Sequence, residues 1–406
     1  MPQLNDAFRF AHMSDCHLGS WSNHPEMKEF AIRAFETAID KCIDEKVDFI
    51  IIAGDLLDTS LPGIDVLKRA VSSFRRCKEA GIPVYMVAGS HDYSPTGKTM
   101  LSVFENAGLI VDVAKCTENN GRIVLEFTVD AKTGCKITGV FGRKGSLEVE
   151  SFSRIEIPHE QTDGAKIFVF HCGIDEHRSM QGMSSVPISL LPEGFNYYAT
   201  GHIHVRRIYQ TEHGSVAFPG PLFPTSFDEL EHYDSGFYIV ECGGKTSVRD
   251  VPVKMFETFL IDREVTGKTP GEVESMILDM LPESLENTVL LLRLRGTLNG
   301  RPSDIDFKNV AERAESLGAI CLKKNISKLS SEAMEEMRVE NITNIDDLER
   351  QLIAKHAGRM KLFSREDVEQ LVFSLMNVLK EEKGEDETNA TFEEKIRENA
   401  KKLLDL

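Results

Sequence analysis

The sequence predicts an α/β protein, and three observations support that prediction. Over the first 110 residues, short apolar runs rich in β-branched residues alternate with amphipathic helical segments, which is the order of parallel strands joined by covering helices. Several of these runs end directly in aspartate or histidine. The composition, 41% hydrophobic and 28% charged, is that of a soluble globular protein, and 406 residues exceed one ordinary core, so we expect two or three domains.

The other elements are arranged around the strand expected at residues 47–53. Its apolar run ends in glycine, and Asp55 and Asp58 follow, so a buried strand delivers two carboxylates at its carboxyl end. Open α/β sheets place their chemistry at that edge. The strands expected at residues 8–13 and 82–88 run into similar loops. Those loops contain Asp15, His17, Ser90, His91 and Asp92.

The same patterns define the rest of the first domain. We expect helices at about residues 25–45, 64–80 and 98–107, further strands at 166–170 and 197–200, and a closing strand at 236–240. Apolar residues alternate with polar ones between residues 121 and 141, so the second half of the sheet is expected to be antiparallel. The two later strands end at His171 and at the pair His202 and His204.

Beyond residue 250 the pattern changes to that of a smaller α+β domain. We expect its strands at 257–263, 288–295 and 319–323 and its helices at 270–280 and 306–317. The expected domain limits are 1–250, 251–328, a polar linker at 329–343, and a helical region at 344–406. The apolar stripe of that last region includes Leu348, Leu352, Val368, Leu371 and Leu375. Such a stripe packs either on the protein's own body or on a partner.

Composition also excludes several classes of protein. No apolar run approaches the roughly 20 residues that span a bilayer, and the start of the chain lacks a secretory signal pattern, so we expect a cytoplasmic protein. Eight single cysteines without a CxxC pair indicate a reducing compartment. The formal net charge of -18 argues against a broad basic surface. Three Gly-Lys-Thr triplets lack the preceding glycine of a Walker loop, which excludes that loop.

Five histidines and four aspartates directly follow strand-like runs. They are His17, His91, His171, His202 and His204, with Asp15, Asp55, Asp58 and Asp92. One histidine in such a place is usually structural, but nine such residues in one domain predict a metal site. Carboxylate and imidazole without thiolate suit manganese, iron or zinc in a hydrolytic role. Two ions about 3.5 to 4 Å apart activate a water and hold the oxygens of a phosphoester, which is the substrate class that this set predicts.

These motifs carry a resemblance. Asp-x-His, Gly-Asp-x-x-Asp, Gly-x-His-Asp, a later histidine and Gly-His-x-His, in that order, resemble the calcineurin-like binuclear metallophosphoesterases over about residues 8 to 240. More narrowly, the run from Asp15 to Gly19 and the segment from Pro219 to Glu229 resemble the archaeal form of the meiotic-recombination-eleven family of double-strand-break repair nucleases, akin to bacterial SbcD. That resemblance implies a two-layered β-sandwich of mixed sheets flanked by helices, a DNA-capping α+β domain and C-terminal helices.

The resemblance also implies roles for individual residues. It makes Asp15, His17, Asp55 and His204 ligands of one Mn²⁺, and Asp55, His171 and His202 ligands of a second in the same subunit. His91 would be the catalytic imidazole, oriented by Asp58. The family has asparagine where this chain has Ser90, whose shorter side chain is a weaker ligand, so we expect weaker occupancy of the second site.

The activity implied is that of a manganese-dependent 3′ to 5′ exonuclease and single-strand endonuclease, which processes DNA ends at the nucleoid with an ABC-type coiled-coil ATPase bound near residues 345–380. A homodimer would form through Leu67, Val71, Phe74, Leu101 and Phe104, for which core packing is the alternative. Phosphate contacts would come from Arg293, Arg295, Lys323 and Lys324, for which a solvated face is the alternative. Two other functions stay open, a small-molecule phosphodiesterase and a non-catalytic scaffold for the ATPase.

Overall fold

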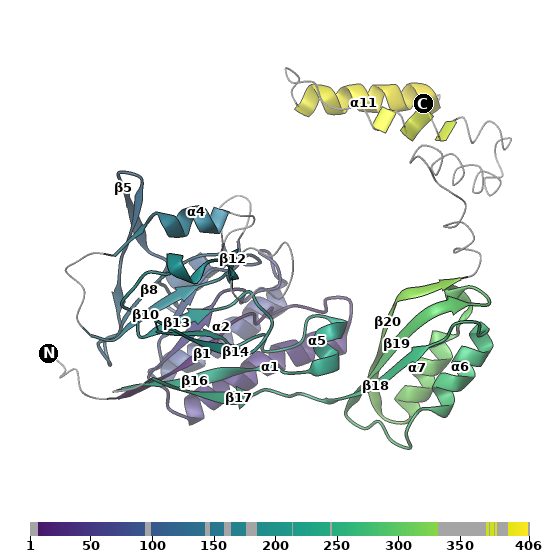
Figure 1. Cartoon of the computed structure of the whole chain (residues 1–406), viewed down its shortest axis with the longest axis horizontal. Coiled ribbons are helices and arrows are strands. Elements are labelled where there is room, and N and C mark those ends of the chain that lie inside the picture. Colours follow the sequence, from purple (N-terminus) through teal and green to yellow (C-terminus); the bar gives the residue numbers. More distant parts are fainter. Residues whose placement is uncertain are drawn as a thin grey trace. The chain divides into compact units, whose positions relative to one another are not determined.

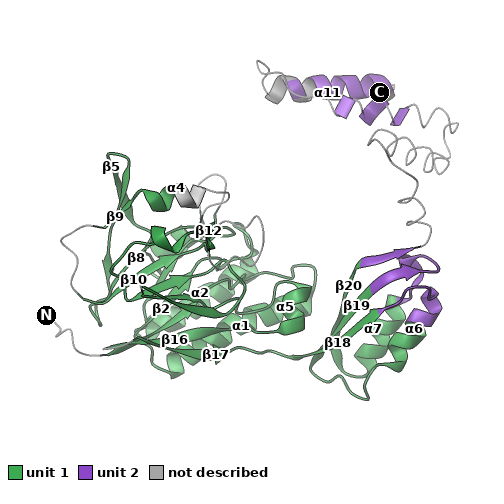
Figure 2. Ribbon diagram, in the orientation of Figure 1, with its two compact units in different colours: residues 1–263, 274–294, 307–327 green, residues 264–273, 295–306, 328–406 purple. Residues whose placement is uncertain are grey.

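A computed structural model of the chain describes residues 7–93, 99–142, 147–157, 164–175, 185–212, 214–243, 246–331, 371–372, 374–376, 378–379 and 389–404. The chain divides into two compact units (Figure 2). The first consists of residues 1–263, 274–294 and 307–327, and the second of residues 264–273, 295–306 and 328–406. The domain limits expected from the sequence stay a prediction.

The first sheet has the strand order β17-β16-β1-β2-β3-β4 (Figure 1). Its strands are β1 (Phe8–Met13), β2 (Phe49–Ala53), β3 (Val84–Val87), β4 (Val111–Asp112), β16 (Gly236–Cys242) and β17 (Ser247–Pro252). The four strands from β1 to β4 are parallel, as the alternation of strands and helices predicted, and β16 and β17 are antiparallel to their neighbours. Parallel order places the loops after β1, β2 and β3 at one edge.

The second sheet has the order β14-β15-β13-β10-β8-β7. Its strands are β7 (Thr128–Val129), β8 (Lys136–Val140), β10 (Lys166–Phe170), β13 (Tyr197–Thr200), β14 (Arg207–Thr211) and β15 (Gly214–Phe218). Smaller sheets contain β5 (Cys116–Asn119), β6 (Arg122–Leu125) and β9 (Ile155–Glu156), and β11 (Gly173–Ile174) with β12 (Ser185–Val186).

The expected antiparallel second half is wrong in its central part. The strand β8 pairs parallel with β10, and β10 and β15 both pair parallel with β13, whereas only the edge strands β7 and β14 are antiparallel. Alternating apolar residues identify a strand with one buried face, but they carry no information on the direction of its neighbour. The helix α4 (Leu147–Ser153) lies between β8 and β10 in the chain, as a connection between parallel strands requires.

Both sheets contribute to one shared core. Phe49 and Ile51 of β2 pack in the same apolar cluster as Ile167 of β10 and Tyr197 of β13. The alternate residues of β2 face the other way, toward the helices α1 (Pro25–Asp44) and α2 (Ile64–Glu79). The fold is therefore the two-layered sandwich of mixed sheets flanked by helices that the family resemblance implied.

The remaining helices include α3 (Leu101–Asn106), α5 (Phe227–His232), α6 (Pro270–Asp279), α7 (Phe307–Ser316) and α11 (Asn389–Leu404). A third sheet, β18-β19-β20, consists of Glu257–Glu264, Thr288–Leu298 and Ala319–Ser331, with α6 and α7 between its strands in the chain. The last strand runs well past the expected end at residue 323. No helix in the described part of the chain is long and apolar enough to span a membrane.

The residues expected at a dimer surface divide into two groups. Phe74, Leu101 and Phe104 are buried in the core, where Phe74 and Phe104 pack edge to face, so core packing is correct for these three. Val71 is exposed and Leu67 is half-buried. Helical periodicity identified one apolar stripe, but a short helix such as α3 needs its large residues to anchor it. The exposed apolar side chains of this region also include Leu61, Ile64 and Val103.

Of the expected partner-docking residues, Leu348, Leu352 and Val368 lie outside the described residues. Leu371 and Leu375 are helical and half-buried. The docking of this stripe on an ATPase stays a prediction.

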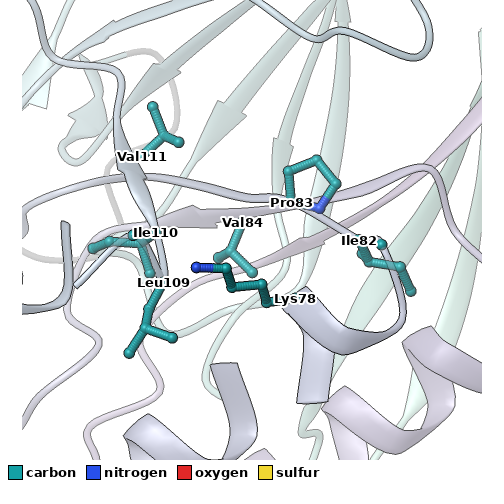
Figure 3. A pocket seen from close by; sticks show the side chains of 9 residues that line it. Lys78, Ile82, Pro83, Val84, Leu109, Ile110 and Val111 are labelled. Atoms are coloured by element: carbon teal, nitrogen blue, oxygen red, sulfur yellow. The ribbon is translucent and has the colours of Figure 1, made fainter. Parts of the chain in front are cut away.

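A pocket of about 280 Å³ opens at the amino end of β3. Figure 3 shows Lys78 beside Pro83, Ile110 and other apolar side chains that line it. The loop that carries His91 follows the opposite, carboxyl end of β3. This pocket therefore belongs to the other edge of the sheet and takes no part in the candidate site.

We expect Phe49→Ala to lower the free energy of unfolding by about 3–5 kcal/mol, because Phe49 is fully buried between the sheets and stacks on Phe10 at 5.0 Å between ring centroids. Urea unfolding followed by circular dichroism measures the change. Val129→Ala is the control, since that exposed side chain should change stability by less than about 0.5 kcal/mol. Equal effects of both variants would contradict a shared core.

Candidate metal centre

The loops after β1 and β2 are held together by their backbones. The amide of Asp15 donates to the carbonyl of Gly54 at 3.1 Å, and the amide of His17 donates to the carbonyl of Asp55 at 3.0 Å. Asp15, His17 and Asp55 all have positive φ, as does His202. Such a conformation is costly for residues with a side chain and is typical of functional sites. In this conformation the side chains of all four residues belong to the two donor groups described next.

The first group of donors consists of Asp15, His17 and His204. The Nε2 atoms of His17 and His204 lie 3.2 Å apart, and Nε2 of His204 lies 3.5 Å from Oδ1 of Asp15. Asp15 is fully buried, and its carboxylate also accepts from the amide of His202. Two imidazole nitrogens and a carboxylate thus converge, which is a donor set for a divalent transition metal.

The second group consists of Asp55, His171 and His202. Oδ2 of Asp55 lies 3.0 Å from Nε2 of His171 and 3.9 Å from Nε2 of His17. The Asp55 carboxylate therefore faces both groups, as a carboxylate that bridges two ions must. Nδ1 of His171 donates to the carbonyl of Ala53 at 2.8 Å, which directs the buried Nε2 toward the Asp55 carboxylate and leaves it available as a ligand.

The electrostatics of these groups follow from their burial. Desolvation would raise the pKa of Asp55, but His171 and His17 hold it well below its usual range, and His204 does the same for Asp15. Burial would lower the pKa of His171, yet Asp55 raises it to about 9, and hydrogen bonds to Asp15 and Glu229 raise the pKa of His204 to about 10. Two buried carboxylates are stable only with positive charge beside them. Bound cations would supply that charge, and the imidazoles could then stay neutral.

Glycines make room for the Asp55 carboxylate and for His171. A Cβ on Gly89 would lie 2.2 Å from Oδ1 of Asp55, and a Cβ on Gly54, which has φ +87°, would lie 2.3 Å from Nδ1 of His171. Any larger residue would collide with a donor side chain. The glycines of the sequence motifs are therefore part of the site's packing.

His91 is exposed beside the two groups. Its amide donates to Oδ1 of Asp55 at 2.7 Å, and its Nδ1 donates to the backbone carbonyl of Asp58 at 2.7 Å. The carboxylate of Asp58 lies instead 3.5 Å from Nδ1 of His17. The contact between Asp58 and His91 thus runs through the backbone, and the imidazole stays open to a substrate.

Asp92 and Ser90 lie beside the two donor groups and belong to neither of them. The Asp92 carboxylate is buried and accepts from the amides of Leu57 at 2.9 Å and Gly89 at 3.0 Å, so it ties the loops after β2 and β3 together. Burial and the charge of Asp55 raise the pKa of Asp92 to about 6. Oγ of Ser90 lies 3.5 Å from Oδ2 of Asp55, a long contact for a hydroxyl.

Sequence reasoning missed the role of Glu229. Its carboxylate accepts from Nδ1 of His204 at 3.0 Å, and Ser226 caps the helix α5 that carries it. A carboxylate behind a metal-binding histidine fixes the tautomer and raises the basicity of the other nitrogen. The sequence signal was the capping box from Ser226 to Glu229. A pocket of about 620 Å³ lined by His202, His204 and Glu229 lies next to this contact and leaves space for a substrate.

The expected phosphate contacts occupy different environments. Arg293 pairs with Asp228 at 2.5 Å and Glu231 at 2.7 Å. Arg295 and Lys324 are exposed, and Lys323 is buried. Lys323 and Lys324 line one pocket, and neither Arg293 nor Arg295 belongs to that lining.

The donors fit a pair of divalent cations. Both groups combine imidazole with buried carboxylate, one carboxylate faces both, and His171 directs a buried nitrogen toward that carboxylate. Among the described residues, no cysteine belongs to either group. This arrangement suits hydrolysis of a phosphoester.

Several known proteins are similar to this chain in sequence. A family model described as calcineurin-like phosphoesterase matches residues 8–206. A DNA double-strand break repair protein Mre11 of Archaeoglobus fulgidus is 24% identical over 75% of this chain and 71% of its own length. The Mre11 of Methanococcus maripaludis is 25% identical over 84% of this chain and 89% of its own length. The Mre11 of Sulfolobus acidocaldarius is 27% identical over 83% of this chain and 88% of its own length.

Gly89→Ala should weaken Mn²⁺ binding at least about tenfold, because the added methyl group displaces the Asp55 carboxylate. Isothermal titration calorimetry measures the affinity. Gly271→Ala is the control, since a Cβ there meets nothing within 4 Å. Unchanged affinity in Gly89→Ala would contradict the close packing described here.

Ser90→Asn should tighten the binding of the second Mn²⁺ by about tenfold, because the longer side chain brings an amide oxygen toward Asp55. Calorimetric titration resolves two binding events if their affinities differ. Identical stoichiometry and affinities in the variant and the natural protein would show that Ser90 does not limit the second site.

Proposed function

Residues 8–206 belong to the calcineurin-like phosphoesterases, and from that premise we propose that this metal-dependent phosphoesterase is a manganese-dependent DNA nuclease that processes the ends of DNA double-strand breaks. The proposed activities are 3′ to 5′ exonuclease on duplex DNA and endonuclease on single strands. The names of the archaeal relatives and the 71% to 89% of their lengths that this chain spans support the DNA substrate.

One observation carries the proposal. The buried Asp55 carboxylate lies between two donor groups, and its Oδ1 accepts from the amide of the exposed His91. The same residue thus joins the place where cations would bind to the imidazole that would reach the substrate. A site built for storage or structure would have no use for an exposed histidine fixed in this way.

The ligands would be Asp15, His17, Asp55 and His204 for one Mn²⁺, and Asp55, His171 and His202 for the other. Two cations held there would supply an activated water and positive charge for the hydrolysis of a phosphodiester. The chain supplies the remaining functions. His91 is exposed and held through Nδ1 by the Asp58 carbonyl, so as an imidazolium it would protonate the leaving oxygen through Nε2.

The proposed partners follow from the family. Helices between residues 345 and 380 would bind an ABC-type coiled-coil ATPase. A homodimer would form through the exposed side chains of Leu61, Ile64, Val71 and Val103 rather than through the buried Phe74, Leu101 and Phe104.

The deciding experiment measures Mn²⁺-dependent cleavage of end-labelled duplex and single-stranded DNA, beside bis-p-nitrophenyl phosphate. His91→Asn should lower the rate at least about 100-fold while Mn²⁺ still binds. Asp55→Asn should abolish both cleavage and metal binding. Asp65→Asn, at an exposed carboxylate, is the control.

Labels at the 3′ and at the 5′ end give the polarity. Cleavage of bis-p-nitrophenyl phosphate without cleavage of either DNA would make the protein a small-molecule phosphodiesterase. A protein that binds Mn²⁺ and cleaves none of the three would be the scaffold.

A further inference from the structure

A second pocket, of about 570 Å³, lies among the loop after β1, the helices α5 and α7, and the strand β20. Its lining includes the aromatic side chains of Trp21, Phe227 and Phe307 and the ammonium groups of Lys308, Lys323 and Lys324. All of these residues belong to the first compact unit. The pocket contains none of the metal-binding groups.

Lys323 is the unusual member of this pocket. The residue is only 6% exposed, and its Nζ has no hydrogen-bond partner among the described residues. Nζ lies 4.6 Å from the centroid of the Trp21 ring, and burial lowers the pKa of the amine. A buried ammonium normally pairs with a carboxylate, because desolvation without a partner costs free energy. The chain has more acidic residues, 65, than basic residues, 47, so a carboxylate partner would be easy to provide. The ammonium group of Lys323 instead contacts the face of the Trp21 ring.

A second lysine of this pocket has the same arrangement. Nζ of Lys324 lies 4.0 Å from the Phe307 centroid. A cation–π contact leaves the N–H donors of an ammonium group free for another acceptor, whereas an ion pair engages them. Lys323 and Lys324 therefore offer N–H donors to an anion that enters the pocket.

The shape of the pocket identifies the class of anion. A volume of about 570 Å³ exceeds what a phosphate group fills, and three aromatic side chains line the pocket together with Ala311, Leu322 and one carboxylate, Glu315. Lysine for the phosphate and rings for the base are the two components of sites for single-stranded nucleic acid. Trp21 also lies four residues beyond His17 on the same loop, and its Nε1 is fixed by donation to the carbonyl of Pro224 at 2.7 Å.

We propose that this pocket seats one nucleotide of a DNA single strand, with its phosphate on Lys323 and Lys324 and its base against the aromatic walls. The inference rests on the proposed nuclease function and adds to it a binding site away from the metal centre. The seated nucleotide would hold the strand beside the loop that carries Asp15 and His17.

Trp21 is the only tryptophan of the chain, so intrinsic fluorescence reports on this pocket directly. The full-length protein with Mn²⁺, in the His91→Asn background to prevent cleavage, is titrated with a single-stranded oligothymidylate. We expect a saturable fluorescence change whose affinity falls with added salt. Lys323→Met should weaken that binding about tenfold. Lys328→Met, on an exposed side chain of the same strand, should leave it unchanged.

Thymidine monophosphate and inorganic phosphate are the other two probes. The proposal requires the oligonucleotide to bind at least about tenfold tighter than either. Equal affinity for the monophosphate would make this a free-nucleotide site, and equal affinity for phosphate would make it a simple anion site; both results overturn the proposal. Lys323→Arg keeps the charge and should retain binding if the variant with methionine fails to fold.

The two proposals fail separately. If the wild-type protein cleaves DNA but its Trp21 fluorescence does not change with the oligonucleotide, the pocket proposal is refuted and the nuclease proposal is supported. A saturable oligonucleotide signal in a protein that cleaves no DNA would support the pocket and refute the nuclease.

Discussion

The buried Asp55 carboxylate is the group on which the rest of the structure depends. It lies 3.0 Å from Nε2 of His171 and 3.9 Å from Nε2 of His17, and it is 2% exposed. A charge in that position is tolerable only if several loops bring positive charge and donors to it. Those loops come from both sheets, since His17 follows β1 and His171 follows β10. The packing of the two sheets, the glycines beside the donors and the hydrogen bonds from Leu57 and Gly89 to Asp92 together hold the carboxyl ends of the strands close to one another.

The acidic balance of the chain gains a physical meaning from this arrangement. A net charge of -18 repels DNA at long range, so contacts with a strand need local positive charge. Arg293 forms ion pairs with two carboxylates, but the ammonium groups of Lys323 and Lys324 make cation–π contacts with aromatic rings. Cations bound near Asp15 and Asp55 would add further local positive charge. Net charge therefore describes the surface as a whole and says little about these two places.

The strands and the donors of the site could be predicted because each depends on local pattern. The run from Phe49 to Asp58 identifies a buried strand and its tip without reference to any distant residue. The direction of β8, in contrast, depends on which strand lies beside it. The burial of Phe74 depends on contact with Phe104, which is far along the chain. Glu229 escaped notice as a partner of His204 because its capping box explains it locally.

The two donor groups differ in what stands behind their histidines. Nδ1 of His204 contacts the carboxylate of Glu229, and Nδ1 of His17 lies near the carboxylate of Asp58. Nδ1 of His171 instead contacts the neutral carbonyl of Ala53. Anionic partners raise the basicity of an imidazole more than a carbonyl does. The second group also has Ser90 at its edge, with Oγ 3.5 Å from Asp55. Both differences concern the same group, so we expect a cation there to bind more weakly than at the group of Asp15, His17 and His204.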